Sequence, residues 1–373
     1  MKKILFVVDE MSMGGVSKVL IDLLKRLDTE IYDIDLLVLH KRGELLADVP
    51  SHIHIIDSTP FFEACDVSLM KARGKTLFSK LRLLFYMKSG LIFDRIVKER
   101  KKIIKKDYDT EIAFKEGFST IFVASGDTKR KLNWVHVDYK VQNYSKHHMA
   151  LMKKALSKID LNVACSKVVE SSYKEVFGID DVITIHNMID EETIKEKASR
   201  EIDYPYGDEK INLITVARFH PQKALDRLIK AYAKVKDDYT LTIIGDGPLK
   251  KELFDLKDHL GVEVMFLGQI KDPYAYIKRA DLFVLSSLYE GYPTVVIESL
   301  LSETPVLAME VAGVKEQITK EYEGMVIPND EKALLDALIA LKDKKELLRS
   351  YKRELVSKHY DNTTILKEIE EIL

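Results

Sequence analysis

One pattern occurs repeatedly in each half of the 373 residues: a short apolar run, a polar break, and then a segment with helical periodicity. The first copy opens with the apolar run 4–8 and the helical segment 16–27; the second opens near Lys210, with 211–216 and 222–234. Short apolar strands that alternate with helices indicate a parallel sheet covered on both faces. We therefore predict an α/β protein with two doubly wound, Rossmann-like domains that face each other across a cleft.

The expected strands are short, continuous apolar runs. In the first copy they cover 4–8, 34–39, 53–56, 111–114, 132–137, 162–165 and 182–185, and in the second 211–216, 239–244, 262–267, 282–285 and 305–309. The polar segment between the copies is typical of a linker. We expect domains at residues 1–190 and 209–355, a linker at 191–208 and a C-terminal helical segment at 356–373.

Composition narrows the classes of function. Lys and Arg number 58 and Asp and Glu 60, and this near-neutral balance argues against a nucleic-acid partner. Two cysteines in different regions, Cys65 and Cys165, suit a reducing, cytoplasmic compartment. The apolar run 4–8 is too short for a signal-peptide core, and no run of roughly 18 apolar residues predicts a membrane span.

A basic insertion, at about 60–108, interrupts the first copy. Residues 71–106 hold 13 Lys and Arg and only two acidic residues, Asp94 and Glu99, and apolar residues recur among them at helical spacing. This mixture favours attachment to an anionic surface, namely the inner face of the plasma membrane. The alternative is a pair of helices with a solvated basic face and a buried apolar face.

In folds of this class, ligands lie outside the carboxyl ends of the strands. Gly14 and Gly15 follow the first strand and open a helix, which suits close approach of an anion, although a plain tight turn explains them too. The segment 245–248, Gly-Asp-Gly-Pro, is equally explained as a turn. His136 ends a strand of the first domain. It either faces a ligand or is packed within the protein. The dinucleotide fingerprint G-x-G-x-x-G is absent.

The second domain offers charged residues after its strands. Arg218 and Lys223 lie near a helix start, where the helix dipole disfavours cations, so they are either solvated or matched by an anionic ligand. Glu290 precedes a helix, and Glu298 lies in an apolar helical stretch, on its solvent face or bound to a ligand hydroxyl. The first amides of that helix, at 294–295, could hold a phosphate. No cluster of residues has metal-ligand spacing, so we expect no metal.

Together these motifs resemble the GT-B glycosyltransferases of family 4, which are retaining, nucleotide-sugar enzymes. Arg218 with the run 222–228 is similar to the family's R…QKG-x-D-x-L, and Glu290 with Glu298 to its E-x7-E. Gly14-Gly15, His136 and the segment 245–248 complete the resemblance. Two departures, Ala224 for the usual glycine and Ala312 in a usual double glycine, replace a small residue by another small residue and put the resemblance in little doubt.

The resemblance implies a metal-independent, retaining hexosyltransferase without a cofactor. It would move a sugar from a UDP-linked or other nucleotide-diphosphate donor to a glycan or lipid-linked acceptor, in surface polysaccharide or glycoconjugate synthesis. It also implies that the final helix, 362–373, returns to the first domain. Two alternatives stay open: a nucleotide-sugar epimerase of GT-B fold and a non-catalytic GT-B partner subunit. The glutamate spacing disfavours the first alternative, and the retained site residues disfavour the second.

The resemblance also assigns roles to residues. Arg218 and Lys223 would grip the diphosphate, Glu298 the ribose, and Glu290 and His136 hydroxyls of the sugar; backbone at 268–270 would meet the base. The implied catalytic residues are His136, Arg218, Lys223 and Glu290, and the implied donor-binding residues are Gly14, Gly15, Gly268, Gln269, Ile270, Gly291, Tyr292, Pro293, Thr294, Val295 and Glu298.

Overall fold

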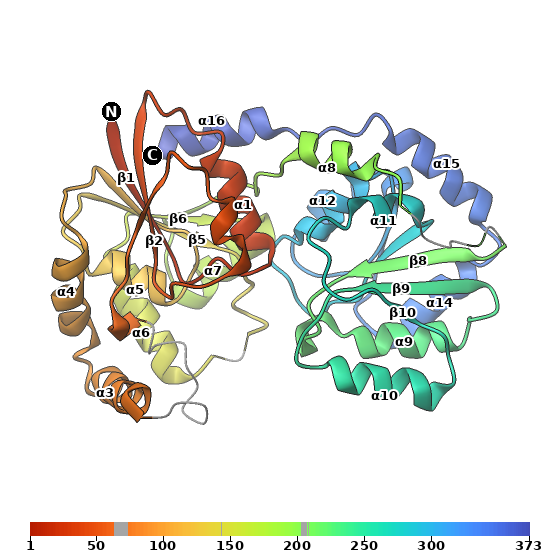
Figure 1. Cartoon of the computed structure of the whole chain (residues 1–373), viewed down its shortest axis with the longest axis horizontal. Helices are drawn as coiled ribbons and strands as arrows, with labels where there is room; N and C mark the ends of the chain where they lie inside the picture. The colour runs from red at the N-terminus through yellow and green to blue at the C-terminus, as the bar shows by residue number, and fades with distance from the viewer. Residues whose placement is uncertain (63–73, 143, 203–206, 208) are drawn as a thin grey trace. The chain divides into compact units, whose positions relative to one another are not determined.

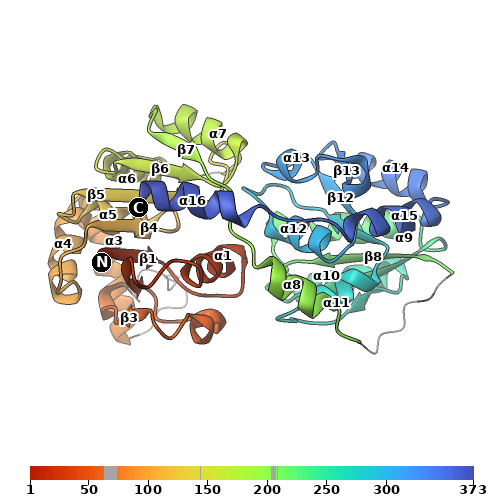
Figure 2. The same cartoon turned by 90° about the horizontal axis from the view of Figure 1, so that it is seen from above.

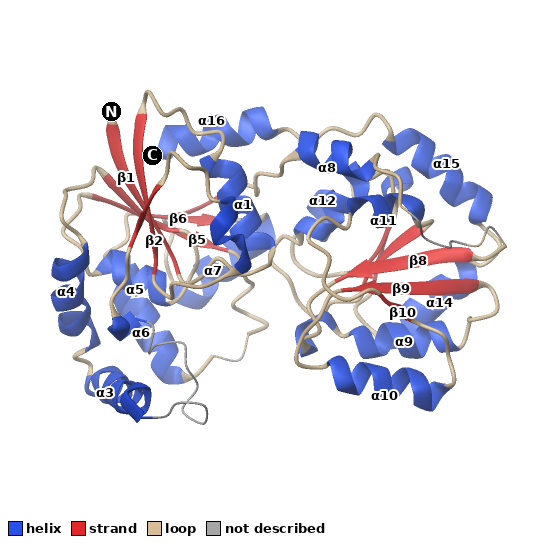
Figure 3. Cartoon of the chain, in the orientation of Figure 1, coloured by secondary structure: helices blue, strands red, loops and turns tan. Residues whose placement is uncertain are grey.

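The computed structural model describes residues 1–62, 74–142, 144–202, 207 and 209–373. Two compact units make up this part of the chain: unit 1 comprises residues 1–188 and 362–373, and unit 2 comprises 189–361. Each unit is built on a parallel sheet with helices on both of its faces, which confirms the predicted α/β class (Figures 1 and 3). Residues 63–73 of the basic insertion, which include Cys65, and residues 203–206 and 208 of the expected linker lie outside the described residues.

Unit 1 has seven strands. They are β1 (Lys2–Val8), β2 (Tyr32–Val38), β3 (His54–Ile56), β4 (Thr110–Ala113), β5 (Arg130–Val135), β6 (Leu161–Ala164) and β7 (Val182–Thr184). Their order across the sheet is β3-β2-β1-β4-β5-β6-β7, and every pair is parallel. The chain moves outward in one direction from β1 to β3 and in the other from β4 to β7. The point between β1 and β4 is therefore the topological switch point of unit 1, where such sheets bind ligands.

The helices of unit 1 cover both faces of its sheet. They are α1 (Gly15–Leu24), η1 (Glu44–Asp48), α3 (Gly74–Ser89), α4 (Ile92–Ile103), α5 (Phe118–Ala124), α6 (Lys146–Leu156), α7 (Lys167–Phe177) and α16 (Asn362–Ile372). Helices α4, α5 and α6 pack together on one face, and α16 lies on the other (Figures 1 and 2).

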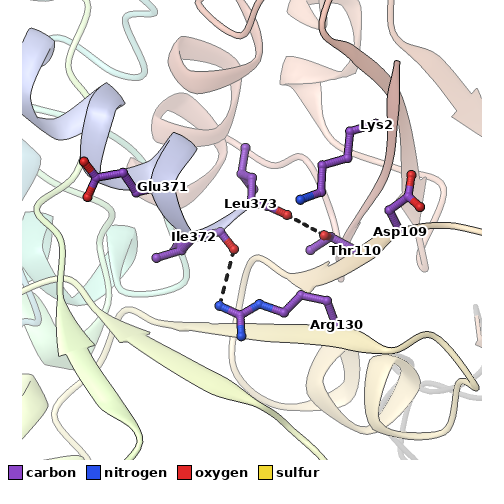
Figure 4. Close-up of a pocket in the computed structure, with 7 residues that line it drawn as sticks. All are labelled: Lys2, Asp109, Thr110, Arg130, Glu371, Ile372 and Leu373. Carbon is purple, nitrogen blue, oxygen red and sulfur yellow. Dashed lines mark hydrogen bonds between the residues drawn. The ribbon is translucent and has the colours of Figure 1, made fainter.

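The end of α16 contacts the amino ends of β4 and β5. The Thr110 hydroxyl donates a hydrogen bond to the Leu373 carbonyl oxygen at 2.6 Å, and the Arg130 guanidinium donates to that of Ile372 at 3.5 Å. An open pocket lies between these groups and Lys2 (Figure 4). It is at the amino edge of the sheet, opposite the edge that carries the candidate ligand loops.

The basic insertion divides into two helices with different surroundings. Helix α4 buries Ile92, Phe93 and Ile96, and its Arg100 makes a buried ion pair with Glu111 at 2.8 Å. The alternative of a helix with a buried apolar face is therefore right for α4. Helix α3, by contrast, leaves three apolar side chains exposed, Phe78 by 63%, Leu81 by 50% and Phe85 by 62%.

Unit 2 repeats the topology with six strands. They are β8 (Ile211–Val216), β9 (Tyr239–Ile244), β10 (Met265–Phe266), β11 (Leu282–Leu285), β12 (Val306–Met309) and β13 (Gly324–Ile327), in the parallel order β10-β9-β8-β11-β12-β13. The switch point lies between β8 and β11. The expected strand at 262–267 is reduced to two residues, and the sequence pattern did not predict β13.

The helices of unit 2 form two layers. They are α8 (Glu191–Ala198), η2 (Pro221–Lys223), α9 (Leu225–Ala233), α10 (Lys250–Leu260), α11 (Tyr274–Arg279), α12 (Thr294–Leu301), α13 (Val314–Gln317), η3 (Glu321–Glu323), α14 (Glu331–Leu341) and α15 (Lys345–Leu355). Helices α9, α10 and α14 pack together beneath the sheet in Figure 1, and α8, α11 and α12 above it. Residues 191–198, expected within the linker, therefore form a packed helix.

A second difference concerns the expected helix at 222–234. The chain forms the short 3-10 turn η2, passes through Ala224 at φ 44° and ψ 45°, and only then begins α9. The helix is broken because Ala224 adopts the left-handed conformation, which no α-helix of L-residues continues.

Candidate functional site

The loops after β8 and β11 meet at the switch point of unit 2. The Lys223 ammonium lies 2.6 Å from the Glu290 carboxylate oxygen Oε1, and the Gln222 side-chain amide donates to Glu290 Oε2 at 3.4 Å. Both charged side chains are largely buried, with 22% of Lys223 and 9% of Glu290 exposed. The structure thus brings two of the predicted residues together as an ion pair.

Buried hydrogen bonds hold these two loops against each other. Arg227 on α9 donates from Nε to the Ser286 carbonyl oxygen at 2.6 Å and from a terminal nitrogen to that of Ser287 at 2.7 Å. The Ser286 hydroxyl in turn donates to the carbonyl oxygen of Lys223 at 2.8 Å. The pair is therefore preorganised by neighbours that are themselves locked in place. Sequence reasoning quoted Arg227 within a motif but did not give it this role.

Ala224 shows why glycine is usual at this position. The turn between η2 and α9 needs a positive φ, which costs a residue with a Cβ atom roughly 1–2 kcal/mol. The alanine at this position therefore carries backbone strain that a glycine would not. At Gly313, where φ is 81°, an added Cβ would lie 2.8 Å from the Gly291 carbonyl oxygen, so the retained glycine of that pair is required.

Arg218 is exposed and lies two residues after the end of β8. Within the described residues, its side chain has no hydrogen bond or ion pair. The turn at 245–248 packs against its neighbours: a Cβ on Gly245 would lie 2.0 Å from the Ala217 carbonyl oxygen, and one on Gly247 would lie 2.6 Å from that of Phe219. These glycines allow a close backbone approach that fixes the loop on both sides of Arg218. The tightly packed turn accounts for both glycines.

The segment at 268–270 adjoins the same turn. The Gly245 N–H donates to the Gly268 carbonyl oxygen at 2.7 Å, and Gly268 itself has φ 70°. Gln269 is exposed and Ile270 is partly exposed. The backbone proposed to meet the base therefore lies beside the loop that carries Arg218.

Helix α12 presents its first turn after β11. Glu298 on this helix is only 3% exposed, and its Oε1 accepts a hydrogen bond from the Thr294 hydroxyl at 3.1 Å. The alternative of a solvent-facing Glu298 is therefore wrong. Thr294 and Val295 lie in the first turn of α12. Their N–H groups therefore have no carbonyl partner within the helix.

The loop before α12 is fixed by neighbours. The Gln317 side-chain amide donates to the Pro293 carbonyl oxygen at 3.1 Å, and the Tyr360 and Tyr292 hydroxyls are 3.3 Å apart. Sequence reasoning missed Gln317, because this glutamine belongs to no recognised motif.

In unit 1, the predicted residues follow β1 and β5. Gly14 precedes α1 in an extended conformation, and a Cβ added there would meet nothing within 4 Å, so its glycine has no steric cause within unit 1. The His136 backbone N–H donates to Glu116 Oε2 at 2.8 Å, and its ring Nε2 lies 3.1 Å from the Phe114 carbonyl oxygen. Burial lowers the pKa of His136 to about 4, so the imidazole is neutral at pH 7.

Glu116 is the residue of unit 1 that sequence reasoning missed. It follows β4 at the switch point, and its side chain is buried. Burial raises the pKa of the Glu116 carboxyl, and the hydrogen bond from the His136 amide opposes that rise. The predicted strand at 111–114 ends two residues earlier, so a systematic search of the loops after strands would have found it.

The described residues contain no group of three or more His, Cys, Asp or Glu side chains that could hold a metal ion. They also contain no helix that is both long and apolar enough to cross a membrane.

Comparison with known proteins places this geometry in context. Residues 198–355 match the family model described as glycosyl transferases group 1. A Campylobacter jejuni protein, N-acetylgalactosamine-N,N'-diacetylbacillosaminyl-diphospho-undecaprenol 4-alpha-N-acetylgalactosaminyltransferase, is 31% identical over 190 residues, which are 49% of this chain and 51% of the relative. The putative teichuronic acid biosynthesis glycosyltransferase TuaC of Bacillus subtilis is 29% identical over 201 residues, 52% and 50% of the two chains. The chain thus spans about half the length of these two relatives.

Among solved structures, Anabaena HepE in complex with UDP and glucose is similar over 100% of this chain and 99% of its own, with a TM-score of 0.74 and 18% identity. This similarity confirms the predicted GT-B fold.

Proposed function

We propose, from the match of residues 198–355 to the glycosyl transferases group 1, that this chain is a retaining hexosyltransferase that uses a UDP-sugar donor. The observation that carries the proposal is the Lys223–Glu290 ion pair, 2.6 Å long, at the switch point of unit 2 and within the matched residues. A cation beside a carboxylate suits a ligand that has an anionic diphosphate next to a hydroxyl-rich sugar.

Charge on the leaving group sets the chemistry. When the anomeric bond breaks, negative charge develops on the departing diphosphate, and fixed cations aimed at that charge lower the barrier. Lys223 supplies a point charge, and Arg218 supplies a planar fork that can bind two phosphate oxygens. Glu290 neutralises Lys223 in the structure. In the complex, Lys223 turns to the diphosphate, and Glu290 accepts a hydroxyl of the sugar.

The remaining donor contacts follow from the elements around this pair. The first-turn N–H groups of α12 at 294–295 bind a phosphate, and the buried Glu298 accepts from the ribose hydroxyls. The backbone at 268–270 meets the base. The UDP complex of HepE supports uracil as that base. We assign no metal and no cofactor to the reaction, because Arg218 and Lys223 supply the charge that the leaving group needs.

The acceptor is proposed from two independent observations. The Campylobacter relative is named for a diphospho-undecaprenol-linked substrate and the Bacillus relative for teichuronic acid, which supports a lipid-linked or polymeric glycan. Helix α3 exposes Phe78, Leu81 and Phe85 beside the exposed basic residues Arg82 and Lys88. Exposed apolar side chains flanked by cations suit the surface of an anionic membrane. We therefore place the protein peripherally at the cytoplasmic face of the membrane.

The two glutamates test the donor site. Glu298→Ala should weaken UDP binding in titration calorimetry, because a buried hydrogen-bond partner of the ribose is lost. Glu290→Ala should leave UDP affinity near wild type and lower turnover by about 100-fold, since its contact matters in the transition state. Equal loss of UDP affinity in both variants would contradict the assignment.

The same assay separates the alternatives. Release of UDP together with an epimerised free sugar, without any acceptor, would identify an epimerase. UDP binding without turnover of any tested donor, with lipid acceptors present, would identify a non-catalytic subunit. Turnover should persist in excess EDTA; loss in EDTA that magnesium or manganese restores would overturn the metal-independent assignment.

Membrane attachment is tested on α3. Changing Phe78, Leu81 and Phe85 together to Ser should release the protein from phosphatidylglycerol vesicles in co-sedimentation. The matched control changes Ile339 and Leu347, two exposed apolar residues of unit 2, to Ser, and should leave binding unchanged. Equal binding by both variants would contradict the proposal.

A further inference from the structure

Glu116 is a buried carboxylate that the proposed function does not use. It lies in the loop after β4, beside the switch point of unit 1, and is followed by Gly117 at φ 113°. That conformation turns the chain into α5 and leaves the Glu116 side chain directed to the neighbouring strand end, where Oε2 accepts the His136 N–H at 2.8 Å. Burial penalises an ionised carboxyl, so a neutral side chain would suit packing alone better.

The hydrogen bond from His136 continues the sheet beyond its last ladder pair. The β4–β5 ladder ends at Ala113 and Asn133, and β5 ends at Val135, so His136 is the first residue past the strand. Glu116 takes up the N–H that a longer β4 would have bound. The end of β5 is thereby fixed by a side chain, and the direction in which the His136 ring leaves the backbone is fixed with it.

A second contact fixes the ring itself. His136 Nε2 lies 3.1 Å from the Phe114 carbonyl oxygen, which can only accept, so Nε2 carries the proton of the neutral imidazole. The Phe114 ring packs against the His136 ring, with centroids 5.4 Å apart. Nδ1 is consequently the acceptor nitrogen, and within the described residues it has no hydrogen-bond partner.

We propose that Glu116 is the positioning residue for His136: its carboxyl holds the end of β5 so that Nδ1 is presented as an acceptor to a hydroxyl of the sugar. This inference rests on the proposed function for the identity of the ligand. Glu116 acts through the backbone of His136 and does not contact the sugar. Any group at 116 that accepts the same N–H preserves the role, whether or not it is charged.

The charged neighbours of Glu116 are engaged in their own contacts. Asp9, which follows β1, accepts from the Ser119 hydroxyl at 2.7 Å and lies 3.9 Å from the Lys115 ammonium. Within the described residues, Glu116 is therefore the carboxylate that accepts the His136 backbone N–H. Glu116→Gln therefore isolates the charge from the hydrogen bond, because the glutamine carbonyl oxygen accepts the same N–H.

The test compares Glu116→Gln, Glu116→Ala, His136→Ala and the double variant Glu116→Ala/His136→Ala in hydrolysis of UDP-glucose, UDP-N-acetylglucosamine and UDP-N-acetylgalactosamine. We expect Glu116→Gln to stay within about 3-fold of wild-type kcat and Glu116→Ala to lose about 10-fold, with UDP affinity unchanged in both. The double variant should lose no more than His136→Ala, because one residue acts through the other. Glu170→Gln, which alters a carboxylate on α7 bonded to Thr184, Lys167 and Lys174, is the matched control.

A readout that does not need turnover keeps the inference separate from the proposed function. Nitrogen-15 NMR of labelled imidazoles should show His136 protonated at Nε2 in wild type and Glu116→Gln, and as a mixture of tautomers in Glu116→Ala. Additive losses in the double variant, or an unchanged tautomer in Glu116→Ala, would overturn the inference. If no donor is turned over, the proposed function fails and the tautomer result still decides the role of Glu116. If Glu116→Ala does not fold, Glu116→Asp, whose shorter side chain does not reach the N–H, replaces it.

Discussion

The two switch points have the same topology and opposite electrostatics. In unit 2, Lys223 and Glu290 form an ion pair 2.6 Å long. In unit 1, burial raises the pKa of Glu116 and lowers that of His136 to about 4, so both groups move toward their neutral forms. One parallel sheet edge can therefore serve a charged ligand group and another can serve uncharged hydroxyls, depending on whether the buried carboxylate is paired with a cation, as Glu290 is, or with an uncharged N–H, as Glu116 is.

Charge reversal at Lys223 tests the switch point of unit 2. Lys223→Glu should lower turnover by about 1000-fold, because it replaces the cation for the leaving group by an anion. Adding Glu290→Lys should restore thermal stability, since the ion pair re-forms, but should not restore turnover. The matched control exchanges the exposed pair Asp226 and Lys230, 2.8 Å apart on α9, and should change neither quantity. Recovery of turnover in the Lys223–Glu290 exchange would show that the pair is only structural.

The next effect tests the neutral switch point by pH. The folded pKa of His136, about 4, lies below its unfolded value of about 6.5, so this residue contributes stability above pH 6.5 that is lost as pH falls through 4. The full effect is about 3 kcal/mol. Glu116 acts in the opposite sense, because its raised pKa contributes stability at low pH that is lost as pH rises. The free energy of unfolding should therefore fall more steeply with decreasing pH in Glu116→Gln, and less steeply in His136→Gln, than in the wild type.

The single tryptophan makes this measurement specific to unit 1. Trp134 is buried in β5, with its ring centroid 5.3 Å from that of Phe114. Its fluorescence during urea unfolding, from pH 7 down to pH 4, reports the unit that contains His136. His359→Gln in unit 2 is the control and should leave the curve unchanged. If the free energy of unfolding depended on pH in the same way in the wild type, Glu116→Gln and His136→Gln, the proposed electrostatic contrast between the units would be contradicted.

The smallest effect concerns the backbone of the two loops. Ala224→Gly should stabilise unit 2 by about 0.5 kcal/mol, because relief of the left-handed conformation outweighs the added freedom of the unfolded chain. Gly117→Ala should destabilise unit 1, since its φ of 113° then carries a Cβ atom. Chemical denaturation measures both, with Ala231→Gly in the middle of α9 as a control that should cost about 1 kcal/mol. A less stable Ala224→Gly protein would contradict the strain argument.

How far the sequence predicts this molecule depends on burial. The central strands at 211–216, 239–244 and 282–285 have the predicted bounds, because they are buried on both faces and read as unbroken apolar runs. The edge strand β13 was missed, since Gly324 begins it and Met325 is exposed. Helix α8 was taken for linker because it buries only Ile194 and Ala198.

The site shows the same division. Lys223 and Glu290 were found because charged residues after a strand are visible in the sequence, and the structure places them in contact. The break at Ala224 was not predicted, because alanine does not itself signal a positive φ and the glycine usual at this position was considered only for its size. Glu116 carried no motif, and its burial beside His136 comes from the packing of β4 against β5. The sequence alone did not predict which residue each of these side chains contacts.

The return of α16 to unit 1 bears on the order in which the protein is made. Residues 362–373 belong to a unit whose other part ends at residue 188, and the whole of unit 2 lies between them. A ribosome therefore completes unit 2 before it delivers the helix that contacts the starts of β4 and β5 through Thr110 and Arg130. Until then the first sheet lacks the cover of that helix. The unit that begins synthesis first is thus the last to be finished.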